Sequence, residues 1–276
     1  MKPALMLTDL DGTLLRDDKS LSPANRAALE RAAAGGCQVV VATGRLLRAI
    51  PQYLLDLPFL RYFILMNGAK IWDRQTGEVL YRCEIPLPTA KRVFDLIEPL
   101  DCTVDCFQND RGIMDRKYYD HLDYYIPDLI SRQMAQGNRT PVDDFWAAVQ
   151  AGGDTVQKIQ MYFPHLELRP QVSALLHRKV PELIQGISMP ANLELNAAEA
   201  TKGIALVKLC HVLELDPLDT IAFGDGTNDI SMLQAAGMGV AMANAAPETL
   251  AAADLVAPSN QEDGVARTLA RWFPAS

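Results

Sequence analysis

The sequence has no run of lysine and arginine residues and no apolar run long enough to cross a membrane. Its 276 residues carry 26 Lys and Arg against 34 Asp and Glu, which gives a formal net charge of −8. This acidic balance argues against nucleic acid and membranes as main partners, and no segment approaches the ~18 apolar residues of a spanning helix. An anionic substrate remains compatible, because a bound metal and a few local cations can reverse the sign inside one cleft.

Cysteine is also scarce. The five cysteines, odd in number and mostly scattered, are Cys37, Cys83, Cys102, Cys106 and Cys210. We interpret them as free thiols of a reducing compartment. Cys102 and Cys106 lack the C-x-x-C spacing and the paired histidines of a metal or redox site, so packing roles are expected. The apolar N-terminal segment is interrupted by Asp9 and is a poor signal peptide, so the sequence predicts a cytoplasmic protein.

Short apolar runs alternate with helix-forming segments at both ends of the chain. Near the N-terminus we expect strands at 4–8, 39–42 and 63–66 and helices at 23–34 and 46–55. Near the C-terminus we expect helices at 202–213 and 229–236 and strands at 220–223, 240–242 and 254–256. A β-α-β-α-β order implies a parallel sheet with right-handed crossovers. The fold class predicted is therefore α/β, with a Rossmann-like parallel-sheet core.

The middle of the chain breaks this alternation. It is rich in proline and carries tyrosine pairs at 118–119 and 124–125. Expected strands there are 102–107, 157–163 and 192–195, and expected helices are 90–100 and 170–179. We predict a separate α+β domain over 83–197, inserted into a discontinuous core formed by 1–82 and 198–276.

Two carboxylates follow the first expected strand, in Asp9-Leu10-Asp11-Gly12-Thr13. A carboxylate can attack phosphorus and form an acyl phosphate. A second carboxyl within reach can protonate the leaving oxygen and later activate water. Taken alone, a pair of solvated aspartates explains this motif equally well. A calcium-binding loop fits poorly, because Gly12 stands at the fourth position of the pattern and not the sixth.

Two further segments are suited to hold an anion. Thr43-Gly44-Arg45 follows a buried strand and offers a hydroxyl, an accessible backbone N–H and a helix N-terminus. A plain strand-turn-helix connection would look the same. Lys202 opens a helix, where its charge opposes the helix dipole unless an anion lies nearby. A phosphate and a nucleophilic carboxylate would be such anions, and a solvated surface lysine is the alternative.

The fourth segment, Gly224-Asp225-Gly226-Thr227-Asn228-Asp229, lies between a buried strand and a helix. Mg²⁺ prefers a few carboxylates, several waters and a substrate phosphate oxygen. Asp225 and Asp229 offer carboxylates, and Asn228 adds a neutral hydrogen-bonding group. The sequence contains no Walker A motif and no G-x-G-x-x-G. All four segments fall where core strands end or helices begin, and open α/β sheets bind ligands at the carboxyl ends of their strands.

In this order the four segments resemble the haloacid dehalogenase (HAD) superfamily over nearly the whole chain. The insertion between Asn67-Gly68-Ala69 and Lys202, with the run from Val240 to Ala245 after the fourth segment, is similar to the Cof-type branch, whose members carry an α+β cap called C2B. The resemblance implies a Mg²⁺-dependent phosphatase. It would remove phosphate from a small metabolite, such as a sugar phosphate or a cofactor phosphate, through an aspartyl-phosphate intermediate.

The resemblance also assigns roles to the matching residues of the first three segments. Asp9 would be the nucleophile and a metal ligand. Asp11 would be the general acid/base, with its backbone carbonyl on the metal. Thr43 and Lys202 would hold the transferring phosphoryl group, and Lys202 would also orient Asp9.

In the same way, the resemblance implies a set of metal and phosphate contacts. Asp225 would be a direct metal ligand, and Asp229 a direct or water-mediated one. Asn228 would touch phosphate or a metal-bound water. Gly44 and Arg45 would contact phosphate or substrate.

Three other functions fit parts of this pattern. A phosphomutase of related fold would return the phosphoryl group to sugar and would need a bisphosphate activator. A signalling receiver domain also uses an acceptor aspartate with Mg²⁺, but it lacks the Asp11 role and this large insert. A phosphate-binding, non-enzymatic protein would need one carboxylate lost, and none is.

The insert offers five possible substrate contacts, each explained equally well by a solvated surface: Asp105, Arg111, Arg116, Tyr118 and Tyr119. The oligomeric state is left open.

Overall fold

The computed structural model describes residues 2–187, 189 and 191–275, and it divides into two compact units. Unit 1 draws its described residues from 1–45, 50–82 and 199–276, and unit 2 draws them from 46–49 and 83–198. Residues 46–49 and 198 therefore group with unit 2, whereas the sequence predicts them in the core.

The single helix expected over 46–55 is wrong. Pro51 separates a 3₁₀ turn, η1 (Leu47–Ala49), from the short α2 (Gln52–Leu55), because proline has no N–H to continue a helix.

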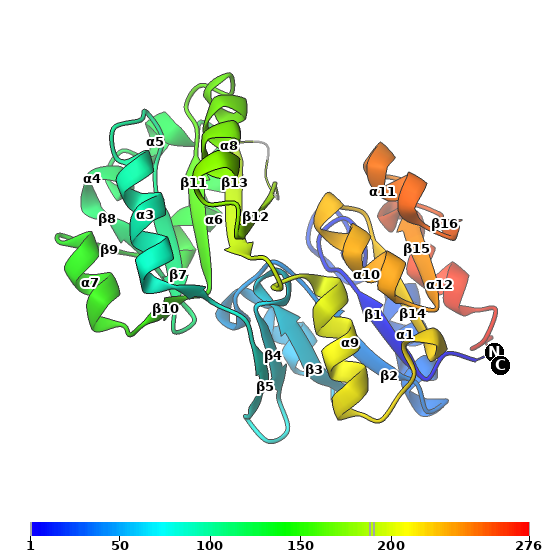
Figure 1. Cartoon of the computed structure of the whole chain (residues 1–276). Coiled ribbons are helices and arrows are strands. Elements are labelled where there is room, and N and C mark those ends of the chain that lie inside the picture. The colour runs from blue at the N-terminus through cyan, green and yellow to red at the C-terminus, as the bar shows by residue number, and fades with distance from the viewer. Residues whose placement is uncertain (1, 188, 190, 276) are drawn as a thin grey trace. The chain divides into compact units, whose positions relative to one another are not determined.

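Unit 1 is built on an eight-stranded sheet in the order β16-β15-β14-β1-β2-β3-β4-β5 (Figure 1). Its parallel strands are β1 (Leu5–Thr8), β2 (Gln38–Ala42), β3 (Leu60–Leu65), β14 (Thr220–Gly224), β15 (Met238–Met242) and β16 (Leu255–Ala257). The predicted parallel core is confirmed. The sequence analysis missed β4 (Lys70–Asp73) and β5 (Val79–Arg82), which extend the sheet as an antiparallel hairpin.

Helices pack on this sheet through mainly apolar buried residues. α9 (Lys202–Val212) and α10 (Ile230–Ala235) pack against the face that carries Leu5 and Leu7. α1 (Pro23–Ala34) contacts β2 and packs against α12 (Gly264–Leu269), and α11 (Pro247–Ala252) contacts β15. α1 begins as predicted, with the Ser22 side chain accepting the backbone N–H of Asn25 and proline in the first turn.

Unit 2 has a six-stranded sheet in the order β12-β13-β11-β7-β8-β9 and a small β10–β6 pair. Among the described residues of this sheet, β8 and β9 pair in parallel and the other neighbouring strands pair antiparallel. Its strands are β6 (Ile85–Pro86), β7 (Asp105–Gln108), β8 (Arg111–Asp115), β9 (Arg139–Val142), β10 (Thr155–Val156), β11 (Lys158–Tyr162), β12 (Leu183–Gly186) and β13 (Asn192–Ala197). Its helices are α3 (Leu87–Ile97), α4 (Arg116–Tyr119), α5 (Leu122–Tyr125), α6 (Leu129–Asn138), α7 (Phe145–Ala151) and α8 (Leu168–Lys179). The α+β class predicted for the insert is confirmed.

The two faces of this sheet differ in polarity. Along β11, Ile159 and Met161 belong to the apolar core of unit 2, and the alternate residues Lys158 and Gln160 are polar yet also buried. Cys102 and Cys106 lie in the same apolar core, and all five cysteines are free. The packing roles expected for these two cysteines are therefore confirmed.

Two ion pairs lie on the polar side of the unit 2 sheet. Arg139 Nε contacts Asp105 Oδ2 at 2.6 Å, and Lys158 Nζ contacts Glu194 Oε1 at 2.8 Å. The Asp105 side chain is fully buried, so the solvated-surface alternative for this residue is wrong. Of the other possible contacts in the insert, Arg111 and Arg116 are exposed, Tyr119 is half-buried and Tyr118 is buried.

Asp105→Ala is expected to lower the free energy of unfolding of unit 2 by about 3–5 kcal/mol, because Arg139 would stay buried without its carboxylate. The double variant Asp105→Leu/Arg139→Leu removes both charges and should lose clearly less. Urea unfolding followed by circular dichroism measures both. Asp143→Ala, which removes the exposed partner of Arg116, serves as the control and should cost under ~1 kcal/mol. Equal losses in the single and double variants would contradict the argument.

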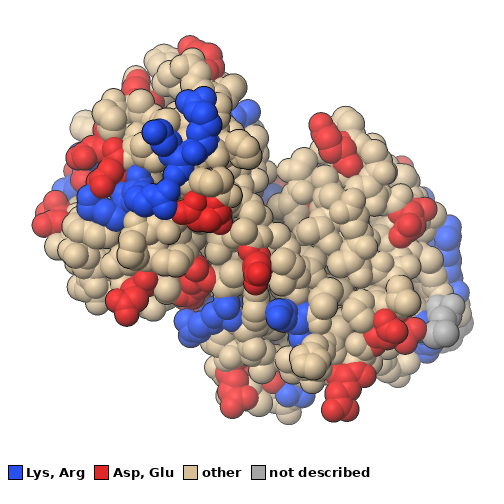
Figure 2. Space-filling model, in the orientation of Figure 1, with Lys and Arg blue, Asp and Glu red and all other residues tan. Residues whose placement is uncertain are grey.

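Among the described residues, no helix is long and apolar enough to cross a membrane. On the face shown in Figure 2, basic and acidic side chains lie close together on unit 2, whereas much of the visible surface of unit 1 carries neither. Figure 2 also shows a continuous band of Lys and Arg side chains across unit 2, bordered by acidic side chains.

Candidate active site

The functional segments of unit 1 meet at the carboxyl ends of three neighbouring strands. In the sheet, β1 lies between β14 and β2, so Asp9, Asp225 and Thr43 follow adjacent strands. The backbone N–H of Asp9 donates to the carbonyl of Phe223 at 3.0 Å, which extends the β1–β14 pairing by one residue. One carboxylate oxygen from each of Asp9, Asp225 and Asp229 lies within 4.8 Å of the others. The structure thus brings together two of the predicted segments in one acidic cluster.

Lys202 completes this cluster. Its side chain is fully buried, and its Nζ lies 2.6 Å from Asp9 Oδ1 and 2.5 Å from Asp229 Oδ1. The solvated-lysine alternative is therefore wrong. Burial opposes a charge on Lys202, but the attraction of Asp229 and Asp9 is stronger and raises its pKa. These contacts favour the charged form of Lys202, which lies between two carboxylates.

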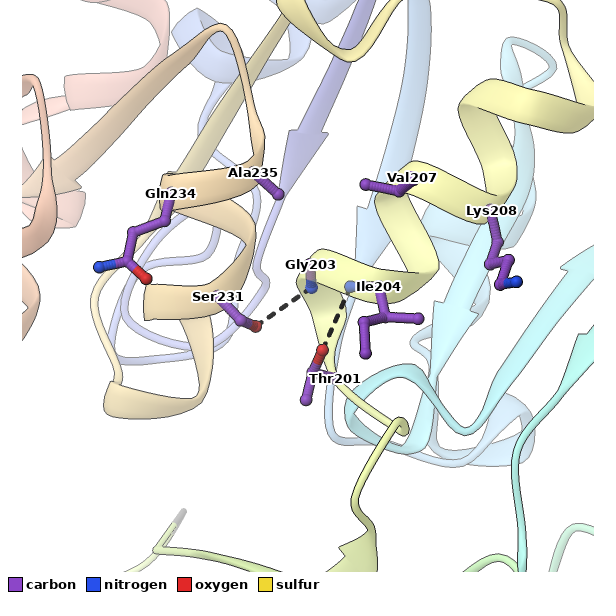
Figure 3. A pocket seen from close by; sticks show the side chains of 8 residues that line it. All are labelled: Thr201, Gly203, Ile204, Val207, Lys208, Ser231, Gln234 and Ala235. Carbon is purple, nitrogen blue, oxygen red and sulfur yellow. Dashed lines mark hydrogen bonds between the residues drawn. The ribbon is translucent and has the colours of Figure 1, made fainter.

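Local packing fixes the start of α9 and with it Lys202. The Thr201 hydroxyl caps the helix by accepting the backbone N–H of Ile204 at 3.1 Å, and the Gly203 N–H donates to Ser231 Oγ on α10 at 3.1 Å (Figure 3). A Cβ on Gly203 would lie 2.2 Å from the Ser231 carbonyl oxygen. Only glycine allows α9 and α10 to approach this closely, so the position of Lys202 depends on its neighbour.

Both carboxylate oxygens of Asp229 are already engaged. Oδ1 accepts from Lys202, and Oδ2 accepts the backbone N–H groups of Asp225 and Gly226 at 3.0 and 2.9 Å. Asp225 is freer: its Oδ1 accepts the Thr13 hydroxyl at 2.6 Å. Lys202 and two backbone N–H groups therefore compete with a cation for this carboxylate, which supports the water-mediated alternative for Asp229.

The cluster is short of positive charge. Burial, together with the neighbouring Asp229 and Asp225, raises the pKa of Asp9 to about 8 although Lys202 acts in the opposite direction. Burial and Asp229 also raise the pKa of Asp225 to about 6. Within the described part of the chain, Asp9 Oδ2 and Asp225 Oδ2 accept no hydrogen bond. Carboxylate oxygens that accept no hydrogen bond and have too little positive charge nearby are suitable ligands for a hard divalent cation. The residues present therefore fit a metal ion.

Asp11 lies outside this cluster of ligand atoms and is held by two cations. Arg45 binds both of its oxygens, with Nε to Oδ2 and Nη2 to Oδ1 each at 2.7 Å, and Lys19 Nζ lies 2.8 Å from Oδ1. Burial opposes the charge on Asp11, but these cations outweigh it and lower its pKa. Arg45, expected as a substrate contact, is thus a partner of Asp11 in this structure.

The phosphate-binding candidates Gly44 and Asn228 are joined by Asn67. Asn228 Nδ2 donates to Asn67 Oδ1 at 3.1 Å, and a Cβ on Gly44 would lie 2.8 Å from that same oxygen. Thr43 is buried, and its hydroxyl oxygen accepts the Arg45 N–H at 3.2 Å. The second and fourth segments are therefore close together.

Sequence reasoning missed the groups that support the site. Asn67, which has a φ of 61°, marked only the edge of the insert, although an Asn-Gly pair after a buried strand is itself a turn signal. Thr13 was part of a motif but had no role, and nothing local identifies Lys19 or Ser231. These residues act through contacts between segments that are distant in sequence.

The sheet, the insertion and the acidic cluster define a Rossmann-like α/β enzyme with an inserted α+β unit. The sequence model of the haloacid dehalogenase-like hydrolase family matches residues 6–269 of this chain. The chain belongs to this family, and the resemblance found in the sequence is confirmed.

Relatives and solved structures agree with this assignment. The chain is 30% identical over 271 residues to the 5-amino-6-(5-phospho-D-ribitylamino)uracil phosphatase YcsE of Bacillus subtilis, covering 97% of this chain and 95% of that protein. A haloacid dehalogenase-like hydrolase from B. subtilis superposes with a TM-score of 0.82 at 28% identity, covering 96% and 98% of the two chains. A HAD subclass IIB sugar phosphatase shares the fold, with a TM-score of 0.82, 24% identity and full coverage of both chains. The chain is therefore an enzyme of the phosphatase class.

Proposed function

We propose that the protein hydrolyses a phosphate monoester of a small metabolite through an aspartyl-phosphate on Asp9. The observation that supports this most directly is the state of the Asp9 carboxylate. Lys202 holds Oδ1 at 2.6 Å, whereas Oδ2 accepts no hydrogen bond from the residues that the structure describes. One oxygen is thus oriented and the other is available to attack phosphorus.

In the first half-reaction, Asp9 Oδ2 forms a bond to phosphorus and the bond from phosphorus to the leaving oxygen breaks. Lys202 stabilises the negative charge of the phosphoryl group during transfer. The Thr43 hydroxyl and the Gly44 N–H are suited to bind its other oxygens. Asp11 donates a proton to the leaving oxygen.

In the second half-reaction, a water molecule attacks phosphorus and the bond to Asp9 breaks, which releases phosphate and restores the carboxylate. Asp11 takes the proton of this water. The first step needs a protonated Asp11, but Arg45 and Lys19 favour its carboxylate form. A bound phosphate offers Arg45 a second anion. Movement of Arg45 from Asp11 to the substrate would raise the pKa of Asp11 and permit proton donation.

The expected cofactor is Mg²⁺. Asp9 and Asp225 would hold it directly, with the Asp11 backbone carbonyl, and Asp229 would act through water. When bound, the ion offsets the repulsion between a phosphate dianion and the Asp9 carboxylate. The acidic cluster is suited to bind such an ion, since Lys202 alone does not balance the charge of its three carboxylates.

The name of a relative and the presence of the insert support a proposal for the substrate class. The B. subtilis relative is named for a phosphate on a ribityl chain, which is a sugar-like monoester attached to a heterocycle. We infer a sugar phosphate or a cofactor-related phosphate as the substrate, with residues 83–197 acting as a cap that selects it. The free thiols support a cytoplasmic enzyme.

Phosphate release from a panel of sugar and cofactor phosphates tests the proposal. We expect turnover with Mg²⁺ and loss of turnover in EDTA. Asp225→Asn should raise the Mg²⁺ concentration needed for half-maximal activity by at least about tenfold. Asp216→Asn removes a carboxylate at the 3₁₀ turn before β14. It is the control and should behave as wild type.

Each alternative gives a different result in the same assay. Isomerisation of a sugar phosphate that requires a bisphosphate activator would indicate a phosphomutase. Phosphate release that is equally fast in EDTA would contradict the metal assignment. Capture of beryllium fluoride by wild type but not by Asp9→Asn, without turnover of any substrate, would indicate a phospho-acceptor protein.

A further inference from the structure

A short loop between β1 and α1 carries Lys19, whose side chain contacts Asp11. The loop is closed by two backbone hydrogen bonds, from the Arg16 N–H to the Ser20 carbonyl at 3.0 Å and from the Lys19 N–H to the Arg16 carbonyl at 2.9 Å. Asp18 Oδ1 also accepts the backbone N–H and the hydroxyl of Ser20, at 2.9 and 2.6 Å. The backbone around Lys19 is therefore held in one conformation.

This conformation is one that a lysine disfavours. The φ of Lys19 is 66°, which lies in the left-handed region that glycine adopts freely and in which a Cβ is crowded. Such residues persist only where the surrounding contacts hold them, and they cluster at functional sites. The chain has a lysine where glycine would give an unstrained loop, which points to a use for the lysine side chain.

Tyr53 holds Lys19 from outside the loop. It lies in α2, 34 positions later in the sequence, and its hydroxyl donates to the Lys19 carbonyl oxygen. Burial raises the pKa of this hydroxyl, so it remains a donor at neutral pH. The charges of Arg45 and Asp11 also act on it, which places Tyr53 beside that ion pair. Tyr53 thus fixes the Lys19 backbone next to the general acid of the proposed mechanism.

The Lys19 ammonium is more than Asp11 needs. Arg45 alone binds both Asp11 oxygens, at 2.7 Å each, and Lys19 Nζ adds a further contact at 2.8 Å from Oδ1. Asp11 is the only ion-pair partner of Lys19 in the part of the chain that the structure describes. An ammonium has three N–H groups, so it can keep this contact and still donate to a ligand. The side chains of Lys19 and Asp11 are 45% and 35% exposed, which leaves them open to a substrate.

The proposed mechanism places the leaving oxygen of the substrate within reach of Lys19. To receive a proton from Asp11, this oxygen must lie about 2.6–3.2 Å from the carboxyl group. Because Nζ lies 2.8 Å from Asp11 Oδ1, it is at most about 6 Å from a leaving oxygen bound to that atom. A hydroxyl on the carbon adjacent to the ester carbon lies inside this radius. A carboxylate there would be repelled by Asp11, whereas a neutral oxygen is not.

On the basis of the proposed function, we propose that Lys19 is a specificity-determining residue for substrates with a hydroxyl on the carbon adjacent to the phosphate-bearing carbon. The Lys19 ammonium donates a hydrogen bond to the oxygen of this hydroxyl, and Tyr53 positions Lys19 for the contact. Polyol and sugar phosphates have such a hydroxyl, whereas simple alkyl phosphates and the matching deoxy compounds lack it. The proposed substrate class thereby narrows to monophosphates of vicinal diols, and the residues that recognise the diol belong to unit 1.

Two probe compounds that differ only in this hydroxyl test the proposal. Glycerol 3-phosphate has the hydroxyl, and 3-hydroxypropyl phosphate lacks it. In an assay of phosphate release with Mg²⁺, the kcat/KM of wild type should be at least about tenfold higher for glycerol 3-phosphate, the effect of one hydrogen bond from a charged donor. Lys19→Met should lower kcat/KM about tenfold for glycerol 3-phosphate and less than about twofold for the deoxy compound. Lys19→Arg keeps a charged donor and should retain part of the preference.

Two further variants separate recognition from folding. Tyr53→Phe removes the hydroxyl that holds the Lys19 carbonyl and should reduce the preference about threefold. Lys19→Gly should lose the preference as fully as Lys19→Met, yet its Tm should not fall below that of wild type, because glycine relieves the backbone strain. Lys208→Met, an exposed change on α9, is the control and should keep both the activity and the preference.

The outcomes distinguish this inference from the proposed function. Equal losses on both probes in Lys19→Met would mean that the lysine acts only on Asp11, and equal kcat/KM values in wild type would mean that the hydroxyl is not recognised. Either result would overturn this inference alone, as would turnover of sugar phosphates that Lys19→Met leaves unchanged. Absence of phosphate release from both probes and from the whole panel of sugar and cofactor phosphates would overturn the proposed function, and this inference with it.

Discussion

Asp9→Asn is expected to abolish phosphate release and, at the same time, to stabilise the metal-free protein. Activity should fall by about four orders of magnitude, since Asp9 is the nucleophile of the proposed mechanism. Stability should rise because the native structure disfavours a charge at this position: burial and two neighbouring aspartates raise the pKa of Asp9 to about 8. The amide keeps the shape of the carboxylate and can still accept from Lys202.

The stability effect should depend on pH in a defined direction. Asp9 titrates near 3.8 when unfolded and near 8 in the native state. Between these values the native state binds more protons, so the stability of the metal-free protein falls as the pH rises. Asp225, with a pKa raised to about 6, adds to this fall over the lower part of the range. Asp9→Asn should therefore flatten the decline of stability between about pH 5 and 8, a range that lies between the two pKa values of Asp9.

Thermal melts in EDTA across this pH range measure the effect. At pH 8 we expect the Tm of the metal-free variant to exceed that of wild type by about 3 °C or more. Mg²⁺ should raise the Tm of wild type, because the proposed metal site exists only in the native state, and it should raise the Tm of the variant much less. Asp56→Asn, an exposed change in unit 1, controls for the general effect of removing an acidic charge. A variant less stable than wild type in EDTA at pH 8 would show that Asp9 is not destabilised in the native state.

The parts of the fold that were predicted correctly carry their signals locally. The strand before Asp9 is a short apolar run that ends at a charged residue, and α1 has its capping serine and proline in sequence. The hairpin β4–β5 was missed because its strands are short and carry charged residues at their ends, such as Lys70 and Arg82. Its place in the sheet depends on pairing with β3, which no local pattern records.

In the candidate site, too, features with a local sequence signal could be predicted and features that depend on distant contacts could not. Asp9 and Asp225 could be placed together because each follows a strand, and parallel strands end at one edge. The Asp11–Arg45–Lys19 ion pairs could not be predicted, because they depend on the direction of three side chains after the chain has folded. The full burial of Asp105 beside Arg139 was missed for a related reason: polar residues that alternate along a strand normally indicate a solvated face.

Lys202→Met is expected to destabilise the metal-free protein strongly, in contrast to Asp9→Asn. The variant leaves Asp9 and Asp229 buried without their cation, and breaking a buried ion pair in this way costs about 3–5 kcal/mol. Phosphate release should fall at least about 10³-fold, since in the proposed mechanism the ammonium stabilises charge on the phosphoryl group. Mg²⁺ should restore part of the stability but little of the activity. Lys208→Met, on the exposed side of the same helix, should change neither by much.

The two variants combined form a double-mutant cycle that tests the pairing itself. In wild type, Lys202 offsets part of the cost of an ionised Asp9, so Asp9→Asn gains only the remainder. In the Lys202→Met background that offset is gone, and Asp9→Asn should stabilise by at least about 1 kcal/mol more than it does in wild type. Urea unfolding in EDTA at pH 8 measures all four proteins. Additive changes would mean that the lysine acts only through Asp229, and the orientation of Asp9 would then need another cause.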